Sequence, residues 1–394
     1  MSTHLNQIKG VKCSSIASGI KSNNPLDLSV ISLIDGTNTA AVFTQNIFCA
    51  APVLVAKNHL NSNIKALLIN SGNANAGTGK RGLENSFKSC EVLAKELNIK
   101  AEEVLPFSTG VIGQLLPIEP FENNSSKLVN SLTEDGLSEV AKGILTTDLV
   151  EKSCSVSFKV DGVKVNLSGV AKGSGMIRPD MATMLSFIVT DIGATQDELQ
   201  QCLDISVNQS FNRITVDGDT STNDACTLSA TNQSGILYSQ CKVEFQKALN
   251  ELTRNLAHKI VKDGEGSTKF VEVSVSGLES NEDCLEVAYT VAHSPLVKTA
   301  LFASDANWGR ILAAVGRARV KGISFENINI SLNEVQIISS GEISDQYSEE
   351  AGSREMEKPE ITIRIDLGGF KTNESVWTTD LSYEYVKINA EYRS

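Results

Sequence analysis

The sequence of 394 residues contains little histidine and no long apolar run. None of its four histidines (His4, His59, His258 and His293) lies in an H-E-x-x-H pair or beside a second typical metal ligand. A histidine-based triad or metal site is therefore disfavoured, and a catalytic nucleophile would need another base. No apolar run reaches the ~20 residues of a membrane span, and the first residues lack a signal-peptide core. A cytoplasmic protein is expected.

The eight cysteines include no C-x-x-C pair, which argues against a zinc site. A reducing cytosol argues against disulfides, so we expect the cysteines to act as small buried apolar residues. Acidic residues outnumber basic ones by 47 to 35, which gives a net charge of −12. Because such a surface repels phosphate backbones and anionic lipids, neither nucleic acid nor a membrane is an expected partner.

Apolar periodicity predicts strands and helices that alternate along the whole chain. The segments typical of strands are Ala66–Asn70, Cys154–Val160, Val163–Gly169, Leu185–Thr190, Val271–Val275, Ile328–Ile338, Ile361–Leu367 and Val376–Ile388. Helices are expected at about Leu83–Leu97 and Lys242–Val261, and between them after Thr195, which forms a capping box with Glu198.

The connections between these elements indicate the fold class. Asp161-Gly162 favours a tight hairpin turn between two of the strands. A loop is expected at Ser71–Gly82, and a mobile surface loop at Gly341–Pro359, where charge is high and apolar residues are few. Hairpins and mixed connections favour a layered α+β sandwich over a doubly wound parallel sheet.

Two glycine-rich segments, 77–80 and 264–269, look like phosphate loops but lack the G-K-[ST] order that such a loop requires. The segment from Lys172 to Leu185 is more informative. In one interpretation it is a turn, and Thr183 is an ordinary strand residue. In the other, Thr183 is a nucleophile at the mouth of a buried strand. Threonine needs an adjacent base, and its own α-amine serves once the Ala182–Thr183 peptide bond is cut.

A series of motifs carries a family resemblance. In chain order they are AVFTQN (41–46), NSGNANAGTG (70–79), STGVIG (108–113), TTD (146–148), KGSGMIRPDMATMLSFIVTD (172–191), NRITVDGDTSTND (212–224), DGEGSTK (263–269), SDANWGRI (304–311) and YVKINAEYRS (385–394). Together they resemble the ornithine acetyltransferases, the glutamate N-acetyltransferase family of arginine biosynthesis, over nearly the whole chain.

The resemblance implies a layered αββα-type domain, with a smaller α/β domain within about residues 240–390. It also implies self-cleavage between Ala182 and Thr183 into an α chain (1–182) and a β chain (183–394), assembled as an α2β2 heterotetramer. The implied reaction moves acetyl from N2-acetylornithine to glutamate through acetylated Thr183. No metal or cofactor is implied, and acetyl-CoA is a second candidate donor.

The resemblance also assigns roles to residues. Thr109 and Gly110 correspond to the oxyanion hole, as a hydroxyl and a backbone N–H. The substrate contacts correspond to Thr146, Lys172, Thr183, Glu265, Asn389 and Ser394, with Thr147 an alternative to Thr146. Lys172 suits the α-carboxylate shared by ornithine and glutamate, and Glu265 suits the cationic end of ornithine. Two alternatives stay open: a self-processing aminopeptidase or amidohydrolase, and a metabolite-binding protein without catalytic activity.

Overall fold

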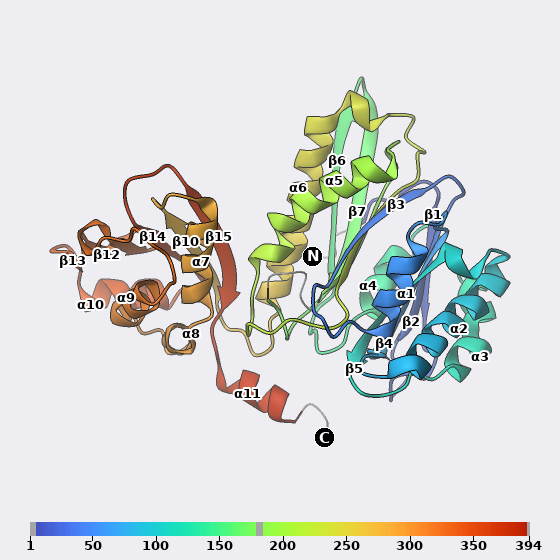
Figure 1. Cartoon of the computed structure of the whole chain (residues 1–394), viewed down its shortest axis with the longest axis horizontal. Coiled ribbons are helices and arrows are strands. Elements are labelled where there is room, and N and C mark those ends of the chain that lie inside the picture. Colours follow the sequence, from blue (N-terminus) through green and yellow to red (C-terminus); the bar gives the residue numbers. More distant parts are fainter. Residues whose placement is uncertain (1–4, 179–183, 392–394) are drawn as a thin grey trace. The chain divides into compact units, whose positions relative to one another are not determined.

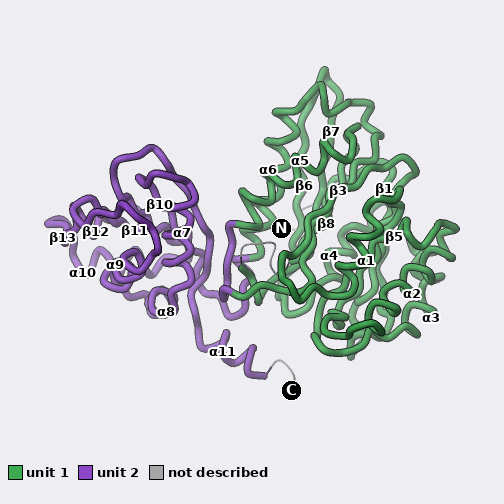
Figure 2. Tube along the Cα trace, viewed as in Figure 1, with its two compact units in different colours: residues 1–212, 219–260 green, residues 213–218, 261–394 purple. Residues whose placement is uncertain are grey.

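The computed structural model describes residues 5–178 and 184–391, which form two compact units. Unit 1 contains residues 1–212 and 219–260, and unit 2 contains residues 213–218 and 261–394 (Figure 2). Two sheets lie in unit 1 and a third lies in unit 2. The expected cleavage position between Ala182 and Thr183 lies outside the described residues.

The first sheet of unit 1, sheet A, has the order β1-β2-β4-β5. Its strands are β1 (Val11–Ile16), β2 (Leu28–Leu33), β4 (Ala66–Asn73) and β5 (Val104–Val111). Only the β4–β5 pair is parallel. Helices α2 (Gly79–Leu97) and α3 (Glu119–Asn130) cover its outer face (Figure 1), where Leu68 of β4 belongs to one core with Leu93 and Phe121. Helix α1 (Ala51–His59) packs on β5 and α2.

The second sheet of unit 1, sheet B, has the order β3-β9-β8-β7-β6. Its strands are β3 (Asn38–Phe43), β6 (Lys152–Val160), β7 (Val163–Lys172), β8 (Leu185–Thr190) and β9 (Ala225–Ala230). Strand β8 is central: it pairs antiparallel with β7 and parallel with β9. Asp161 and Gly162 form the turn of the β6–β7 hairpin with φ of +48° and +83°, as their sequence predicts.

Sheets A and B face one another across a shared core. Leu67 and Ile69, which alternate with Leu68 along β4, lie in this core with Val170 and Phe187 of sheet B. Phe107 of β5 meets Phe187 edge to face, with ring centroids 5.0 Å apart. Helix α4 (Leu137–Gly143) packs on strands of both sheets.

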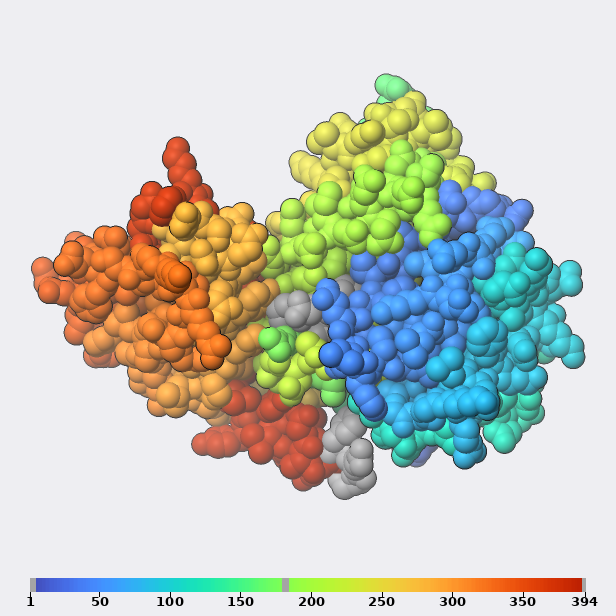
Figure 3. Space-filling model, in the orientation of Figure 1, coloured from blue at the N-terminus to red at the C-terminus, as the bar shows by residue number. Residues whose placement is uncertain are grey.

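Helices α5 (Gln196–Asn208) and α6 (Lys242–Lys262) belong to the outer layer of sheet B. Figure 3 shows them side by side on the surface, in lime and yellow, where Gln246 donates a hydrogen bond to Ser206. Gly169 of β7 leaves room for Leu252 and Leu256 of α6, because a Cβ there would lie 2.9 Å from the Leu252 side chain. Unit 1 is thus an α+β fold with αββα layers, which confirms the predicted fold class.

Unit 2 contains sheet C, with the order β13-β12-β11-β14-β10-β15. The strands are β10 (Phe270–Ser276), β11 (Asn329–Leu332), β12 (Val335–Ser339), β13 (Glu342–Ile343), β14 (Glu360–Asp366) and β15 (Asn373–Thr379). Val271, Val273 and Val275 of β10 are buried and alternate with half-buried residues, so one face is apolar. The core on this face includes residues of α7 (Asn281–Ala292), α8 (Pro295–Phe302), α9 (Trp308–Gly316) and α10 (Glu349–Met356). Helix α11 (Tyr383–Ala390) follows β15.

Most predicted elements appear within a few residues of their expected bounds, and three expectations were wrong. The expected strand Ile328–Ile338 is the β11–β12 hairpin, which turns at Asn333 with φ +49°. The expected strand Val376–Ile388 stops at Thr379, because the Ser382 side chain caps the N-terminus of α11. The expected mobile loop Gly341–Pro359 contains β13 and α10, anchored by the buried Met356.

Two smaller outcomes complete the comparison with the sequence. The expected loop Ser71–Gly82 is shorter, because β4 runs to Asn73 and α2 begins at Gly79. All eight cysteines are free, and only Cys49 and Cys154 are partly exposed. Burial raises the pKa of the Cys226 thiol to about 12. Within the described residues, no helix is both long and apolar enough to cross a membrane.

Candidate active site

Thr109 and Gly110 lie at the carboxyl end of β5, where the parallel pairing with β4 becomes irregular at Asn73. Gly110 has φ +131°, and a Cβ there would lie 2.3 Å from the backbone carbon of Gly72. No side chain fits between two backbones at that distance, so glycine is required here. The chain thus holds a bare peptide group next to the nearly buried hydroxyl of Thr109.

Lys172 is the last residue of β7 and is only 4% exposed. Its Nζ donates a hydrogen bond to Thr109 Oγ1 at 3.3 Å. Sheet A and sheet B therefore meet at this contact, with an ammonium group from one and a hydroxyl from the other. Lys172 also pairs with Leu185, the first residue of β8, in the β7–β8 register.

A buried carboxylate, Asp148, lies between Thr146 and the end of β7. Its Oδ1 accepts hydrogen bonds from Lys152 Nζ and from the backbone N–H of Gly173, both at 2.7 Å. Its Oδ2 accepts one from the backbone N–H of Thr146 at 3.0 Å. Burial alone would raise the pKa of Asp148, but the charges of Lys172 and Lys152, with these hydrogen bonds, hold it well below its usual range. The carboxylate is therefore ionised at neutral pH.

A third ammonium group, that of Lys21, lies close to the two of Lys172 and Lys152. Its Nζ donates to the carbonyl oxygen of Leu145 at 2.7 Å, next to Thr146. Burial lowers the pKa of Lys21, the negative charge of Asp27 opposes that shift, and the positive charge of Lys172 adds to it. Unit 1 thus gathers positive charge around Thr109, Lys172 and Asp148, as binding of an anionic group requires.

Asn223 supports the Thr109–Gly110 segment from a distant part of the chain. Its Nδ2 donates to the carbonyl oxygens of Ser108 and Ala74, at 2.9 and 2.6 Å. The Ser108 hydroxyl in turn donates to Asn70 Oδ1 at 2.6 Å. Sequence reasoning included Asn223 and Asp148 in the NRITVDGDTSTND and TTD motifs but gave them no role. Their position in those motifs was the only available indication, because the carbonyl partners of Asn223 lie 149 and 115 residues away and Gly173 lies 25 residues from Asp148.

Unit 2 pairs two other expected substrate residues. Asn389 of α11 donates a hydrogen bond to Glu265 Oε2 at 2.9 Å, and Glu265 is 9% exposed. The loop that carries Glu265 packs closely on the start of α11: Ser382 Oγ donates to the carbonyl oxygen of Gly266 at 2.7 Å. A Cβ on Gly266, where φ is +66°, would lie 2.5 Å from the backbone nitrogen of Tyr385.

A buried polar network lies at the end of the same loop, directly before β10. Asp380 accepts hydrogen bonds from the backbone N–H groups of Thr268 and Lys269, at 2.8 and 3.0 Å. Lys298, 4% exposed, donates to Thr378 Oγ1 at 3.0 Å and to the carbonyl oxygen of Thr379. Burial lowers the pKa of Lys298 to about 8, against the opposing charges of Asp380 and Asp217. This network fixes the end of β15, from which α11 departs.

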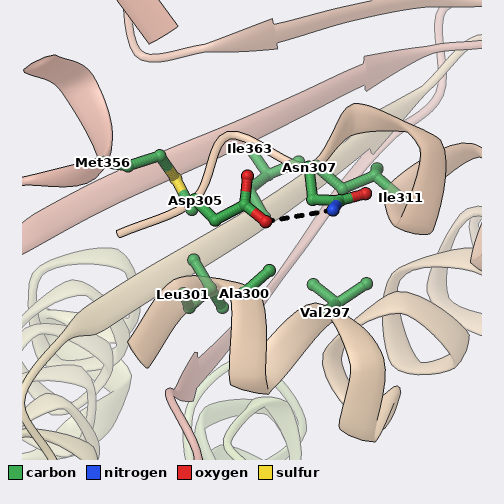
Figure 4. Close-up of a pocket in the computed structure, with 8 residues that line it drawn as sticks. All are labelled: Val297, Ala300, Leu301, Asp305, Asn307, Ile311, Met356 and Ile363. Carbon is green, nitrogen blue, oxygen red and sulfur yellow. Dashed lines mark hydrogen bonds between the residues drawn. The ribbon is translucent and has the colours of Figure 1, made fainter. Parts of the chain in front are cut away.

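A small apolar pocket between α8, α9 and β14 is shown in Figure 4. Val297, Leu301 and Met356 line it, and Asp305 accepts a hydrogen bond from Asn307 at its edge. Its volume of about 10 Å³ holds no more than one water molecule, so it cannot bind an amino acid. In the part of the chain that the structure describes, no group of three or more His, Cys, Asp or Glu residues could hold a metal ion.

The structure thus places the expected site residues in two groups. Thr109, Gly110 and Lys172 meet in unit 1, where Asp148 connects Thr146 to Gly173. Glu265 and Asn389 meet in unit 2. Ala182, Thr183 and Ser394 lie outside the described residues. The catalytic and binding roles of all these residues stay predictions.

Comparison with known proteins gives a consistent family. The model of the ArgJ family matches residues 12–394. Two curated relatives are named "Arginine biosynthesis bifunctional protein ArgJ". The protein from Pseudomonas syringae pv. tomato is 48% identical over 99% of this chain and 98% of its own. The protein from Methylococcus capsulatus is 48% identical over 98% of this chain and 96% of its own.

One solved structure also aligns well. The crystal structure of arginine biosynthesis bifunctional protein argJ from Bacillus halodurans is 37% identical, with a TM-score of 0.51. The alignment covers 53% of this chain and 100% of that one. Together with the family model and the curated relatives, this likeness leads to one conclusion: the chain belongs to the ArgJ family.

Proposed function

We propose that this protein is an acetyltransferase of arginine biosynthesis that moves acetyl from N2-acetylornithine to glutamate through acetylated Thr183. The observation that carries the proposal is the 3.3 Å contact between Lys172 Nζ and Thr109 Oγ1. This contact supports the proposal because it joins the ammonium group proposed to bind the substrate carboxylate to the residues proposed as the oxyanion hole. Thr183 directly precedes Met184 in sequence, and the next residue, Leu185, pairs with Lys172.

The chemistry begins with activation of the chain itself. Thr183 Oγ attacks the carbonyl carbon of Ala182, the peptide becomes an ester by an N→O acyl shift, and water hydrolyses the ester. The products are an α chain of 182 residues and a β chain of 212 residues with a free Thr183 amine. That amine has an ordinary pKa of about 7.7–8.0, so a useful fraction is neutral at cellular pH and can accept a proton.

Acetyl transfer then proceeds in two half-reactions. Thr183 Oγ attacks the acetyl carbonyl of N2-acetylornithine, its amine takes the hydroxyl proton, and that proton passes to the departing ornithine amine. The α-amine of glutamate attacks the acetyl ester, N-acetylglutamate leaves, and Thr183 Oγ regains a proton. Both tetrahedral intermediates are stabilised by Thr109 Oγ1 and the Gly110 N–H. One amide is exchanged for another, so the reaction needs no ATP, metal or cofactor.

Substrate recognition follows from charge. Lys172 pairs with the α-carboxylate that ornithine and glutamate share, and Thr146 supplies a polar contact. Glu265 binds the cationic end of ornithine, with Asn389 holding the Glu265 carboxylate by the hydrogen bond described above. Ser394 supplies a further hydroxyl.

We further propose acetyl-CoA as a second acetyl donor, since its thioester need only reach the same hydroxyl. The name "bifunctional" of the relatives at 48% identity supports this proposal. Assay of glutamate acetylation with acetyl-CoA as the sole donor tests it, and absence of N-acetylglutamate would refute it.

Processing into two chains is supported by the Bacillus halodurans structure. The alignment covers all of that chain but only 53% of this one. Residues 183–394, the expected β chain, make up a similar share of the 394 residues. We propose an α2β2 assembly in the cytoplasm, where the eight free cysteines would stay reduced. A native mass equal to one αβ pair would exclude the heterotetramer.

The decisive experiment compares the wild type with Thr183→Ala and Thr183→Ser. On a denaturing gel the wild type should give two bands, and N-terminal sequencing of one should read Thr-Met-Leu-Ser. Thr183→Ala should stay intact at 42.3 kDa and transfer no acetyl. Thr183→Ser keeps a hydroxyl and should retain part of both the self-cleavage and the acetyl transfer. An intact wild-type chain, or hydrolysis of N2-acetylornithine faster than transfer to glutamate, would overturn the proposal.

A further inference from the structure

Asp148 connects two segments that the proposed function requires to act together. Its Oδ2 accepts a hydrogen bond from Thr146 N–H, and its Oδ1 accepts one from the N–H of Gly173, the residue after Lys172. Twenty-five residues of sequence separate Asp148 from Gly173. The carboxylate therefore sets the spacing between two backbone segments that carry proposed substrate contacts.

The Asp148 side chain is 0% exposed and so is that of its ion-pair partner, Lys152. A buried ion pair recovers little net stability, because the desolvation of both charges offsets their attraction. The ammonium groups of Lys152 and Lys172 already balance the charge of Asp148. The carboxylate nevertheless also accepts two backbone hydrogen bonds. Oδ2 accepts one from Thr146 N–H, and Oδ1, which also accepts from Lys152, accepts one from Gly173 N–H. These bonds fit a function beyond charge pairing.

We infer that Asp148 is a positioning residue of the acetyl-transfer site, whose carboxylate holds Thr146 and Lys172 at the spacing at which both contact one substrate. This inference rests on the proposed function. Asp148 touches neither the reacting atoms nor the substrate in this account; it acts through the two backbone segments. Because a displacement of about 1 Å can cost on the order of 10²-fold in rate, loss of these hydrogen bonds should be visible in kinetics.

The test compares Asp148→Asn with a matched control, Lys152→Gln. Asparagine is nearly isosteric, but its amide group puts a donor where one of the backbone N–H groups needs an acceptor. Lys152→Gln breaks the same ion pair and leaves both backbone hydrogen bonds to Asp148 in place. KM and kcat for N2-acetylornithine and glutamate are measured per mole of β chain that begins at Thr183, and unfolding midpoints are measured alongside.

We expect Asp148→Asn to raise KM for both substrates and to lower kcat/KM on the order of 10²-fold. Lys152→Gln should keep KM within about threefold of the wild-type value, since the backbone hydrogen bonds to Asp148 remain. This should hold even if its unfolding midpoint falls as far as that of Asp148→Asn. If Asp148→Asn folds poorly, the double variant with Lys152→Gln removes both charges of the buried Asp148–Lys152 ion pair and should reproduce the raised KM. Two outcomes would overturn the inference. In one, KM rises in both single variants in proportion to the fall in their unfolding midpoints; in the other, KM does not change in Asp148→Asn.

A double-mutant cycle with Lys172→Met separates positioning from general damage. If Asp148 acts through Lys172, Asp148→Asn should cost much less kcat/KM when Lys172 is already absent. Fully additive losses would contradict the inference. Failure of the proposed function looks different: the wild type would then form no N-acetylglutamate, or Thr183→Ala would still form it.

Discussion

Replacement of Gly110 by alanine tests the backbone contact on which the proposed oxyanion hole depends. With φ at +131°, alanine pays about 1–3 kcal/mol of backbone strain. Its Cβ would also lie 2.3 Å from Gly72 C and 2.6 Å from Asn73 N. These backbone atoms cannot move aside as a flexible side chain could, so overpacking adds about 1–3 kcal/mol. The peptide group that supplies the N–H must shift, and kcat should fall ~10²–10³-fold.

Gly113→Ala is the matched control, because Gly113 also has positive φ, +86°, but a Cβ there meets nothing within 4 Å. Gly113→Ala should therefore lose only the stability that corresponds to the backbone strain of a positive φ. The clash at Gly110 should therefore separate the two variants by about 1–3 kcal/mol, or roughly 2–12 °C in unfolding midpoint. Calorimetry and acetyl-transfer kinetics measure both effects. Equal midpoints and equal kcat for the two variants would refute the reasoning.

Three further predictions concern other parts of the two units. Asn223→Asp places a carboxylate against the carbonyl oxygens of Ser108 and Ala74, so kcat should fall while KM changes little; steady-state kinetics check this, and an unchanged kcat would count against a supporting role. Glu265→Gln removes the charge-assisted contact proposed between Glu265 and ornithine. Because such a contact is worth about 1.5–3 kcal/mol, KM should rise ~10–150-fold for N2-acetylornithine and much less for glutamate; an equal rise for both would be contrary evidence. Lys298 has a pKa of about 8 in the fold against 10.5 as its ordinary value, so the unfolded chain binds more protons between these pH values and the contribution of Lys298 to stability rises with pH across that window. In denaturant unfolding, the stability of Lys298→Met relative to the wild type should therefore decline between pH 8 and 10 by up to about 3 kcal/mol; a constant difference would show that Lys298 does not titrate there.

The sequence predicts those elements well whose determinants are local. Thr195 and Glu198 form the expected capping box, with Thr195 N–H donating to Glu198 at 2.9 Å. Strand β8 occupies Leu185–Thr190 as expected, because an apolar run between polar segments suits a strand buried on both faces. The capping residue Ser382 was overlooked because the apolar residues on either side of it resemble one continuous strand.

The site was harder to predict because its supporting contacts are distant in sequence. Asn223 lies 115 residues from Ser108, and no periodicity connects them. The contact between Lys172 and Thr109 spans 63 residues and two sheets. Family resemblance supplied the names of the site residues, whereas the hydrogen bonds that orient them came only from the fold.

The strand order of sheet B determines how the two-chain form of the protein should be produced. Its strand order interleaves the two expected pieces: β3, β6 and β7 precede residue 183, and β8 and β9 follow it. After cleavage before β8, two strand pairs, β3–β9 and β7–β8, would still join the two fragments by backbone hydrogen bonds. Neither fragment synthesised alone could complete this sheet, and each would present bare strand edges that invite aggregation. Co-production from a single intact precursor is therefore the sound route to the nicked form.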